Sequence, residues 1–369
     1  MSKTVRLGLI GLGGMGQFHA ANILAGKIAR LELMAVADKD AARCAKFPQQ
    51  RAFPSIAEMA ASGAVDAVLI ATPHYQHTPI ALEAIRAGLH VMVEKPVAVH
   101  KADAERLLAE PIRSGQIVAA MFNQRTDDYY LQMRELIRSG ELGEVRRVNW
   151  IITDWFRTCR YYSQGGWRAT WAGEGGGVLL NQCPHNLDLL QWLCGMPVRV
   201  RAFCGFGRYH PIEVEDDVTA YLEFANGATG VFITSTGEAP GTNRLEIAGE
   251  RGRMVYEGDR IHFLRNEQPM SEFSRAAPDA FSAPPRQERS VPAKDHGGQH
   301  VAILQNFVAA ILEGAPLIAP AAEGIHSLEL ANAMLLSAWT GETVSLPLDG
   351  RRYEERLNRQ IAESPAARP

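Results

Sequence analysis

The sequence predicts an α/β protein that begins with a doubly wound parallel sheet and continues into a second α/β domain. Three observations carry this prediction. The chain of 369 residues is longer than one compact core usually serves. Apolar strands and helices alternate over the first third of the chain. From about residue 123 the pattern changes to strands that alternate apolar and polar residues. We therefore expect two domains, residues 1–122 and 123–369.

Composition and charge limit the class of protein. Apolar residues make up 46% of the chain and charged residues 21%, as in ordinary soluble globular proteins. The net charge is −3 with scattered Lys and Arg, which argues against a nucleic-acid partner. No apolar run approaches the ~20 residues that cross a bilayer, and the N-terminus lacks a signal-peptide pattern, so we expect no membrane contact. The five cysteines are widely spaced, which indicates a reduced, cytoplasmic protein.

The N-terminal stretch TVRLGLIGLGGMGQFHAANIL has the form of a dinucleotide-binding turn. A buried strand pattern leads into a glycine turn, a helical pattern follows, and the next strand, LELMAVAD, ends in an acid. The glycines permit the tight turn, the approach of a pyrophosphate and close packing of helix on strand. Unpaired N–H groups at the helix N-terminus favour phosphate. The expected contacts are Gly11, Gly13, Gly14, Met15 and Gly16.

The acid that ends the second strand indicates which cofactor binds. Asp38 follows the glycine turn by about 20 residues, where a carboxylate binds the adenosine ribose 2′-hydroxyl. The same carboxylate would repel a 2′-phosphate, so the sequence favours NAD. Lys39 and Arg43 lie close enough in sequence to leave NADP as the alternative.

Motifs at later strand ends extend the same crevice, because ligands of doubly wound sheets lie beyond the carboxyl ends of the strands. Ser55 and Glu58 form a capping box, and Thr78 caps the helix that Gly88 ends. Lys95 follows a strand and is held by the next proline; a partly desolvated amine there would have a lowered pKa and take part in proton transfer. The further cofactor contacts that we expect are Thr72, Pro73, His77, Glu94 and Lys95.

Four motifs stand out: GLGGMGQFHA at 11–20, ATPHYQHTPIALEAIRAGLHVMVEKP at 71–96, FNQR at 122–125 and GGGVLLNQCPHNLDLLQWLCG at 175–195. With them the chain resembles, over nearly its whole length, the Gfo/Idh/MocA oxidoreductase family, the group of glucose–fructose oxidoreductase and inositol dehydrogenase. The resemblance implies a Rossmann domain, then an α/β domain whose open, mostly antiparallel sheet carries the substrate site. It also implies a nicotinamide cofactor and a homo-oligomer, dimer or tetramer, formed through the outer sheet face.

Local patterns describe the second domain further. The stretch DVTAYLEFANGATGVFITS predicts a hairpin around an Asn-Gly turn. Residues 266–298 are rich in Pro, Ser and charge and predict a long surface excursion. Helical patterns follow at 299–313 and 323–339, and the resemblance implies that these helices pack near the domain junction.

The segment GEGGGVLLNQCPHNLD holds the main catalytic candidates. Its glycines would let the chain pass close to cofactor and substrate, and the apolar stretch after them is strand-like. Pro184 suits the start of a helix that Gly195 ends, so His185 lies in its first turn. The resemblance places this turn beside the nicotinamide ring, with Asn181 and Lys95. We expect His185 to be the acid/base because the pKa of histidine lies near working pH, and Lys95 to stabilise negative charge on the substrate oxygen.

Asn181 departs from the family pattern, in which Asp commonly stands four residues before the histidine. An amide orients a substrate but cannot ionise, so it cannot supply a negative charge to tune Lys95 or His185. Asp188 lies three residues after His185 on the same helix face. It could orient the imidazole, bind a substrate hydroxyl or be a helix-surface charge.

A loop rich in aromatic and basic residues predicts a substrate surface. Its rings and donors suit a sugar, although the loop could equally fold over its own aromatic cluster. His296 and His300 have the spacing of a metal pair, but a third ligand would have to come from elsewhere, so we expect capping or substrate contact and no metal. With Asn123 and Arg125, which the resemblance adds, the substrate candidates are Asn123, Arg125, Trp155, Arg157, Tyr161, Trp167, Arg168, Asn181, His185 and Asp188.

These features predict an NAD-dependent dehydrogenase that oxidises a secondary alcohol of a sugar, glycoside or cyclitol, or runs the reverse reduction. One alternative is an NAD-dependent glycosidase or lyase that uses transient oxidation. Another is a sensor that binds nucleotide without turnover.

Overall fold

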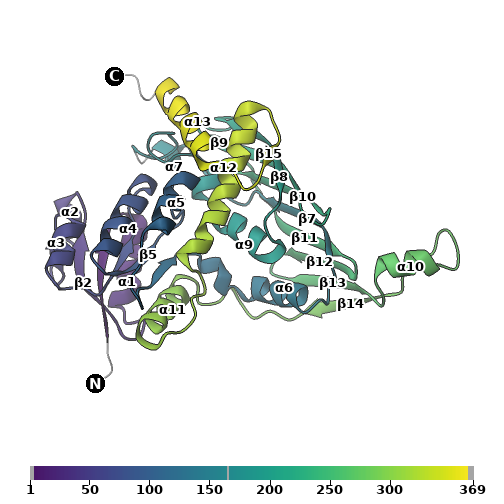
Figure 1. Ribbon diagram of the computed structural model, residues 1–369, viewed down its shortest axis with the longest axis horizontal. Coiled ribbons are helices and arrows are strands. Elements are labelled where there is room, and N and C mark those ends of the chain that lie inside the picture. Colours follow the sequence, from purple (N-terminus) through teal and green to yellow (C-terminus); the bar gives the residue numbers. More distant parts are fainter. Residues whose placement is uncertain (1–3, 164–165, 365–369) are drawn as a thin grey trace.

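The computed structural model describes residues 4–163 and 166–364, which contain two β-sheets and their helices (Figure 1). The first sheet has six parallel strands in the order β3-β2-β1-β4-β5-β6. They are β1 (Val5–Ile10), β2 (Leu31–Ala37), β3 (Arg51–Phe53), β4 (Ala67–Ile70), β5 (His90–Val93) and β6 (Val118–Ala120). The central strands are apolar and buried, as a sheet covered on both faces requires. The predicted doubly wound parallel sheet is confirmed.

Five α-helices follow the first five strands. They are α1 (Gly14–Leu24), α2 (Ala41–Cys44), α3 (Ile56–Ala61), α4 (His77–Arg86) and α5 (Lys101–Ala109). The capping box is confirmed, since the Ser55 hydroxyl accepts the Glu58 N–H at 3.2 Å. The expected cap at Thr78 is wrong. The 3₁₀ helix η1 (His74–Gln76) runs directly into α4, so Thr78 lies inside the helix and lacks the extended backbone of a cap.

The second sheet has nine strands in the order β14-β13-β12-β11-β7-β10-β9-β8-β15. They are β7 (Val145–Ile152), β8 (Arg199–Phe206), β9 (Glu215–Glu223), β10 (Thr229–Ser235), β11 (Asn243–Gly249), β12 (Gly252–Glu257), β13 (Ile261–Asn266), β14 (Arg286–Val291) and β15 (Val344–Ser345). Only β7 and β10 pair in parallel, which confirms an open, mostly antiparallel sheet. The expected hairpin is β9–β10, and Gly227 of its Asn-Gly turn has φ +84°.

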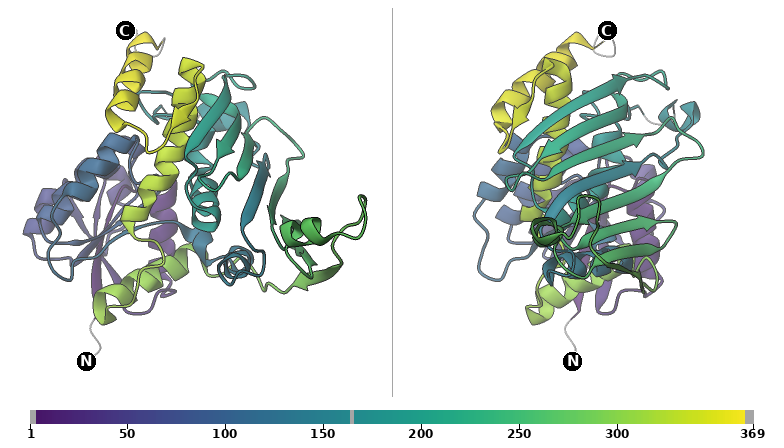
Figure 2. Two further views of the ribbon diagram at one scale, coloured as in Figure 1. Left: turned by 45° about the vertical axis from the view of Figure 1, so that its right-hand side comes forward. Right: turned by 90° about the vertical axis from the view of Figure 1, so that its right-hand side faces the viewer.

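The later helices are α6 (Asp128–Arg138), α7 (Cys159–Ser163), α8 (Val178–Asn181), α9 (Pro184–Cys194), α11 (Gln299–Glu313), α12 (Gly324–Thr340) and α13 (Gly350–Glu363). Helices α6, α8 and α12 contact strands of the second sheet, whereas α11 contacts β1 and α13 contacts α5 and α12. Helix α12 packs against α9 and against β8 of the second sheet. It also contacts α5, which follows β5 of the first sheet, so α12 contacts elements of both domains. In the right-hand view of Figure 2 the strands of this sheet lie in front of α12. Phe203 on β8 and Tyr221 on β9 are exposed and alternate with buried residues, so they lie on the face opposite the core.

Two local expectations are wrong. Residues 266–298 are not a simple surface excursion, because β14 pairs with β13 and extends the sheet, while α10 (Met270–Ala276) projects from its edge (Figure 1). The strand-like stretch after the glycines is the short helix α8, since its backbone turns back toward α9 instead of pairing with a strand. The expected helix at Pro184 is confirmed and ends at Gly195, with φ +81°.

Candidate active site

The glycine turn after β1 is built to admit a phosphate. A Cβ on Gly11, whose φ is +90°, would lie 2.6 Å from the Ala71 carbonyl oxygen. A Cβ on Gly16 would lie 1.9 Å from the Gly11 carbonyl oxygen. A Cβ on Gly13 or Gly14 would meet no atom within 4 Å. The ends of the turn are therefore packed against protein while its middle, at the N-terminus of α1, is open, which fits a dinucleotide pyrophosphate.

Asp38 lies beside this turn. One carboxylate oxygen accepts the Leu12 N–H at 2.7 Å, and the other accepts the Asp40 N–H at 2.9 Å. The Arg43 guanidinium lies 3.5 Å from the carboxylate. Asp38 thus stabilises the glycine turn through Leu12. It also follows β2, where we expect the adenosine ribose of the cofactor.

His77 joins the ends of two neighbouring strands. Its ring nitrogens contact the Pro96 and Thr72 carbonyl oxygens at 2.7 and 2.8 Å. Burial lowers the pKa of His77. The Thr72 hydroxyl is buried without a hydrogen-bond partner among the described residues, which leaves a polar group for a ligand to satisfy. His77 therefore ties together the loops that carry Thr72 and Lys95.

Lys95 connects the end of β5 to α8 of the second domain, and we call the region between these two elements the cleft. It follows β5, the Lys95–Pro96 bond is cis, and its Nζ donates to the Asn181 carbonyl oxygen at 2.6 Å. Burial lowers the pKa of the Lys95 amine, although the charges of Glu94 and Glu174 oppose this. The Asn181 side chain donates to the Glu174 carboxylate and, at 3.3 Å, to the Tyr161 hydroxyl. The structure thus brings Lys95 and Asn181 together, as the sequence indicated.

His185 lies in the first turn of α9 and is buried. Its ring meets the Phe122 ring edge-on at 6.1 Å between centroids, and Nδ1 has no hydrogen-bond partner among the described residues. Burial, reinforced by the charge of Lys95, lowers the pKa of His185 to about 3. The expectation that this pKa lies near working pH is wrong, because the apolar surroundings and the neighbouring ammonium both disfavour an imidazolium. His185 is therefore neutral.

Glu94 has a buried partner that the sequence did not indicate. Its carboxylate contacts His19 Nε2 of α1 at 2.6 Å. Burial opposes ionisation of Glu94, but the His19 hydrogen bond and charge outweigh it and lower the pKa of Glu94 to about 2. The His300 ring lies 5.6 Å from the His19 ring, whereas His296 bonds to Asp127 at 2.7 Å. Among residues 4–163 and 166–364 no three side chains form a metal cluster, and the two histidines face different partners.

The glycines ahead of Asn181 serve protein packing. A Cβ on Gly175 would lie 2.2 Å from Val99, and one on Gly177 would lie 2.0 Å from the Glu215 carbonyl oxygen. The expectation that they make room for cofactor and substrate is wrong, since the atoms they admit belong to the chain itself. The Glu215 carboxylate accepts the Gly177 and Leu179 N–H groups at 2.8 and 3.0 Å and so anchors α8.

The packing at Gly177 predicts a large effect of a small change. Gly177→Ala should lower the free energy of unfolding by about 2 kcal/mol or more, because the new methyl group meets a backbone oxygen that cannot move aside. Thermal unfolding without nucleotide measures the effect. Gly14→Ala is the matched control, since its Cβ points into open space and should leave the unfolding temperature unchanged. Equal unfolding temperatures for both variants would contradict the packing argument.

Arg125 and Asp188 bind each other. The guanidinium donates to both carboxylate oxygens at 2.7 and 2.6 Å, and it also pairs with Glu323. Both residues are about 1% exposed. The surface-charge interpretation of Asp188 is wrong, because α9 is enclosed between α6 and α12. No hydrogen bond joins Asp188 to His185 among the described residues, and the Arg125–Asp188 pair instead links the segment after β6 to α9.

The aromatic loop is partly folded on itself. The Trp167 ring packs against the His74 ring at 5.3 Å. The Arg157 and Arg168 guanidiniums lie 5.3 and 5.1 Å from the Tyr161 ring centre, and Arg168 donates to the Tyr161 hydroxyl at 2.8 Å. Trp155 packs under Arg157, and the Asn123 amide donates to Gln299. Neither Arg157 nor Arg168 pairs with a carboxylate in the described part of the chain, so two cations remain available beside the cleft.

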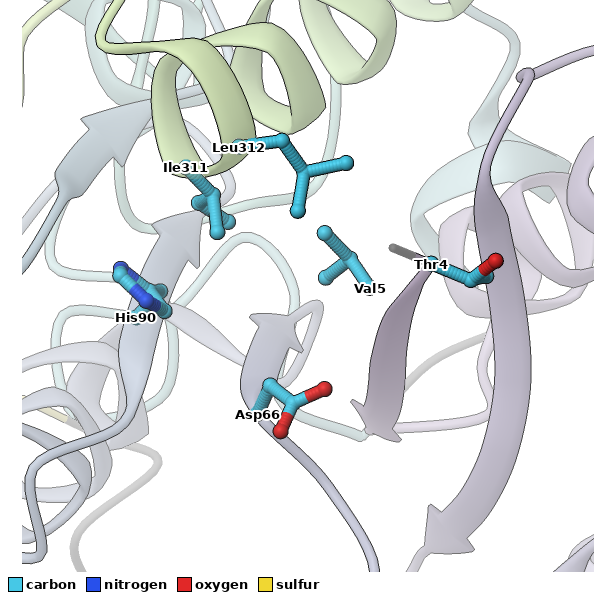
Figure 3. Close-up of a pocket in the computed structure, with 6 residues that line it drawn as sticks. All are labelled: Thr4, Val5, Asp66, His90, Ile311 and Leu312. Atoms are coloured by element: carbon cyan, nitrogen blue, oxygen red, sulfur yellow. The ribbon is translucent and has the colours of Figure 1, made fainter. Parts of the chain in front are cut away.

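A separate pocket is not the cofactor site. Figure 3 shows it lined by Thr4, Val5, Asp66, His90, Ile311 and Leu312. Val5 and His90 begin strands, and Asp66 directly precedes one, so the pocket lies at the amino ends of the parallel strands. Asp66 is paired with Arg6 at 2.6 Å. Ligands of doubly wound sheets bind at the opposite, carboxyl ends, where the glycine turn lies.

Family comparisons agree with this geometry. Residues 5–122 match the oxidoreductase-family NAD-binding Rossmann fold, and residues 130–255 match the GFO/IDH/MocA C-terminal domain. The chain belongs to the GFO/IDH/MocA oxidoreductase family. It is therefore an NAD-binding oxidoreductase, which confirms the predicted enzyme class and cofactor.

Individual family members are similar over almost their whole length. The inositol 2-dehydrogenase of Rhizobium meliloti is 26% identical over 359 residues, 93% of this chain and 99% of that one. The inositol 2-dehydrogenase of Rubrobacter xylanophilus is 27% identical over 368 residues, 96% of this chain and 98% of that one. The WlbA dehydrogenase of Chromobacterium violaceum, solved with NADH and UDP-GlcNAcA, is 28% identical with a TM-score of 0.80, covering 95% and 98% of the two chains. No helix in the described part of this chain is long and apolar enough to span a membrane.

Proposed function

We propose that this oxidoreductase transfers a hydride between NAD and a secondary alcohol carbon of a polyhydroxylated ring, a sugar, glycoside or cyclitol. The observation that carries the proposal is the meeting of Lys95 with Asn181 across the cleft, beside a neutral His185. The similarity to inositol 2-dehydrogenases over nearly the full length supports this substrate class.

Different residues of the chain have different roles at the substrate alcohol group. NAD supplies the hydride acceptor when bound, and the glycine turn and Asp38 would hold it. The Lys95 ammonium donates a hydrogen bond to the alcohol oxygen and stabilises the negative charge that develops there. Neutral His185 accepts the hydroxyl proton. Asn181 holds the Lys95 ammonium through its carbonyl group.

Two arginines favour substrates that carry an anionic group. Arg157 and Arg168 lie beside Tyr161 without a carboxylate partner among the described residues, and guanidinium groups bind carboxylates and phosphates. The similarity to a WlbA dehydrogenase solved with UDP-GlcNAcA supports this second candidate substrate class. Arg168→Met should raise KM for an acidic sugar by about tenfold or more while leaving KM for a neutral polyol within about twofold.

A substrate panel tests the proposal. Purified protein with NAD is offered inositols, neutral sugars, uronic acids and nucleotide sugars, and NADH formation is read by absorbance. We expect turnover with at least one ring alcohol. Failure of all these alcohols and of their keto forms with NADH would reject the proposal. Solvent deuterium incorporation without net NADH would instead support the glycosidase or lyase alternative, and NADH binding without any turnover would support the sensor.

Asp38 should control the choice between NAD and NADP. Asp38→Ser removes the charge that repels a 2′-phosphate, and it leaves Arg43, which lies 3.5 Å from Asp38 and 3.4 Å from Asp40, with one carboxylate fewer. The ratio of kcat/KM for NADP to that for NAD should rise by at least ~10-fold, about 1.4 kcal/mol. Asp66→Ser is the control, because Asp66 pairs with Arg6 at the amino ends of the parallel strands, away from the glycine turn. An unchanged ratio in Asp38→Ser would remove Asp38 from the cofactor site.

We propose two further properties of the whole molecule. The exposed rings of Phe203 and Tyr221 on the open sheet face support a homo-oligomer formed through that face. All five cysteines are free, which supports a reducing, cytoplasmic environment. Sedimentation of the wild type and of Phe203→Lys tests the first property, since the variant should dissociate if the face is an interface.

A further inference from the structure

Among the described residues, no carboxylate contacts the Lys95 ammonium directly. Its Nζ donates to the neutral Asn181 carbonyl oxygen. A charge withdrawn from water is costly unless an opposite charge lies nearby. The charges of Glu94, Glu174, Arg168 and Cys183 act on the Lys95 ammonium, and the ammonium in turn acts on His74, His77, His185 and His300. Burial raises the pKa of the Cys183 thiol to about 12, so Glu94 and Glu174 are the two carboxyl groups of this set that favour the ammonium.

Glu94 is committed to other partners. One of its oxygens contacts His19 at 2.6 Å, and the other accepts the backbone N–H of Lys95 at 3.1 Å. Both oxygens of Glu94 are therefore bound to groups of the first domain other than the Lys95 ammonium. This leaves Glu174 as the carboxylate on the substrate side of Lys95.

Glu174 is linked to Lys95 through a single residue, Asn181, whose side-chain amide contacts Glu174 and whose main-chain carbonyl contacts Lys95. It is about 1% exposed, and one oxygen accepts the Ala169 N–H at 2.7 Å. The other oxygen accepts the Asn181 side-chain amide, while the Asn181 main-chain carbonyl accepts Lys95. Asn181 is thus a bridge between a buried anion and a buried cation that lie on different domains.

We propose that Glu174 is a positioning residue that supplies, through Asn181, the negative charge facing the Lys95 ammonium across the cleft. The inference rests on the proposed function, in which Lys95 acts at the alcohol oxygen. It also explains the amide at position 181. An amide donates to Glu174, whereas a carboxylate there would place two like charges in hydrogen-bond contact.

The charge of Glu174 is held by several groups. Burial raises the pKa of Glu174, while the Ala169 N–H, the Arg168 charge, the Asn181 amide and Lys95 favour its ionised form. The Glu215 carboxylate lies close enough for the two acids to repel each other. Loss of the Glu174 charge should therefore lower the pKa of Lys95, because the neighbouring Arg168 and His185 supply no negative charge in its place.

A charge-relocation series tests the inference in nucleotide-free protein. The variants are Glu174→Gln, Asn181→Asp and the double variant with both changes. The readout is the pH midpoint for acylation of Lys95, followed by mass spectrometry, with the exposed Lys294 as an internal reference. NADH binding by fluorescence confirms an intact cofactor site. Glu329→Gln is the matched control, since it removes a buried carboxylate from Lys101, away from the cleft.

The expected pattern has three parts. Glu174→Gln should lower the Lys95 midpoint by about one pH unit and kcat by about tenfold, with KM for NAD within about twofold. The double variant should return both values toward wild type, since it restores one carboxylate. Glu329→Gln should leave the Lys95 midpoint unchanged. A wild-type midpoint in Glu174→Gln, or no rescue in the double variant, would overturn the inference.

The labelling result does not depend on which alcohol is oxidised. If the Lys95 midpoint moves as expected but no ring alcohol reacts, the proposed function fails and the electrostatic link stands. If a ring alcohol reacts but the midpoint does not move, the link fails and the proposed function stands.

Discussion

Replacing Lys95 with methionine should lower kcat for alcohol oxidation by at least ~10³-fold, because the variant removes the one cation that bonds across the cleft to Asn181. Methionine keeps most of the side-chain volume, so the cleft should retain its shape. NADH binding, measured by fluorescence, should change by no more than about tenfold, since the glycine turn and Asp38 remain. Steady-state and single-turnover rates of NADH formation provide the measurement.

A matched control separates chemistry from stability. Lys95→Met leaves the Asn181 carbonyl oxygen without its donor, which should cost about 1–3 kcal/mol of unfolding free energy. Lys101→Met also removes a buried ammonium, one that bonds to Glu329 and to the Leu348 carbonyl oxygen. We expect Lys101→Met to unfold at lower temperature but to keep its kcat while folded. Comparable turnover in Lys95→Met and wild type would reject the proposed role of the ammonium.

His185→Asn should lower kcat by ~10²- to 10³-fold, because no other neutral base of the described chain stands beside Lys95 at the first turn of α9. The effect should persist over the whole range from about pH 5 to about pH 9. The pKa of His185 is about 3, so the imidazole stays in its proton-accepting form above that value and loses it only as pH falls toward it. Initial rates across this range give the measurement.

The wild-type pH profile provides an independent check on His185. The pH dependence of kcat/KM reports groups of the free enzyme, so it should show no loss of activity centred near pH 6.5, the ordinary value for histidine. His296→Asn is the control, because His296 bonds to Asp127 beneath the β13–β14 edge and should leave kcat within about twofold. An acid limb centred near pH 6.5 that disappears in His185→Asn would show that the imidazole titrates normally and would contradict its burial.

Lys95 and His185 together determine where the proton lies in the resting protein. Lys95 lies close enough to His185 for its charge to disfavour an imidazolium, so the proton of this pair lies on the lysine in the resting protein. The ammonium keeps that proton because Glu94 and Glu174 lie near it, while His185 faces the Phe122 ring. The imidazole is thereby free to receive the alcohol proton at any working pH.

Local patterns determined the first domain and the cofactor. The strand–turn–helix pattern around Gly11 and Gly16 is a backbone requirement, and the structure shows the carbonyl oxygens that exclude a side chain at each position. Lys95 at a strand end and His185 in a helix first turn were also predicted, because strand ends and helix starts have short-range signals. The carboxyl edge of the parallel sheet accounts for the place of Lys95 alone, whereas the expectation that His185 of α9 lies near it came from the family resemblance.

Only the tertiary structure decided the partners of the buried charges. Arg125 with Asp188, Glu94 with His19, and Glu174 with Asn181 are side-chain pairs whose members come together through packing. An acid inside a glycine-rich segment was the sole local signal for Glu174, and it does not state what the carboxylate faces. Hydrogen-bond partners and desolvation depend on which distant segments pack against one another, and no short stretch of sequence contains that information.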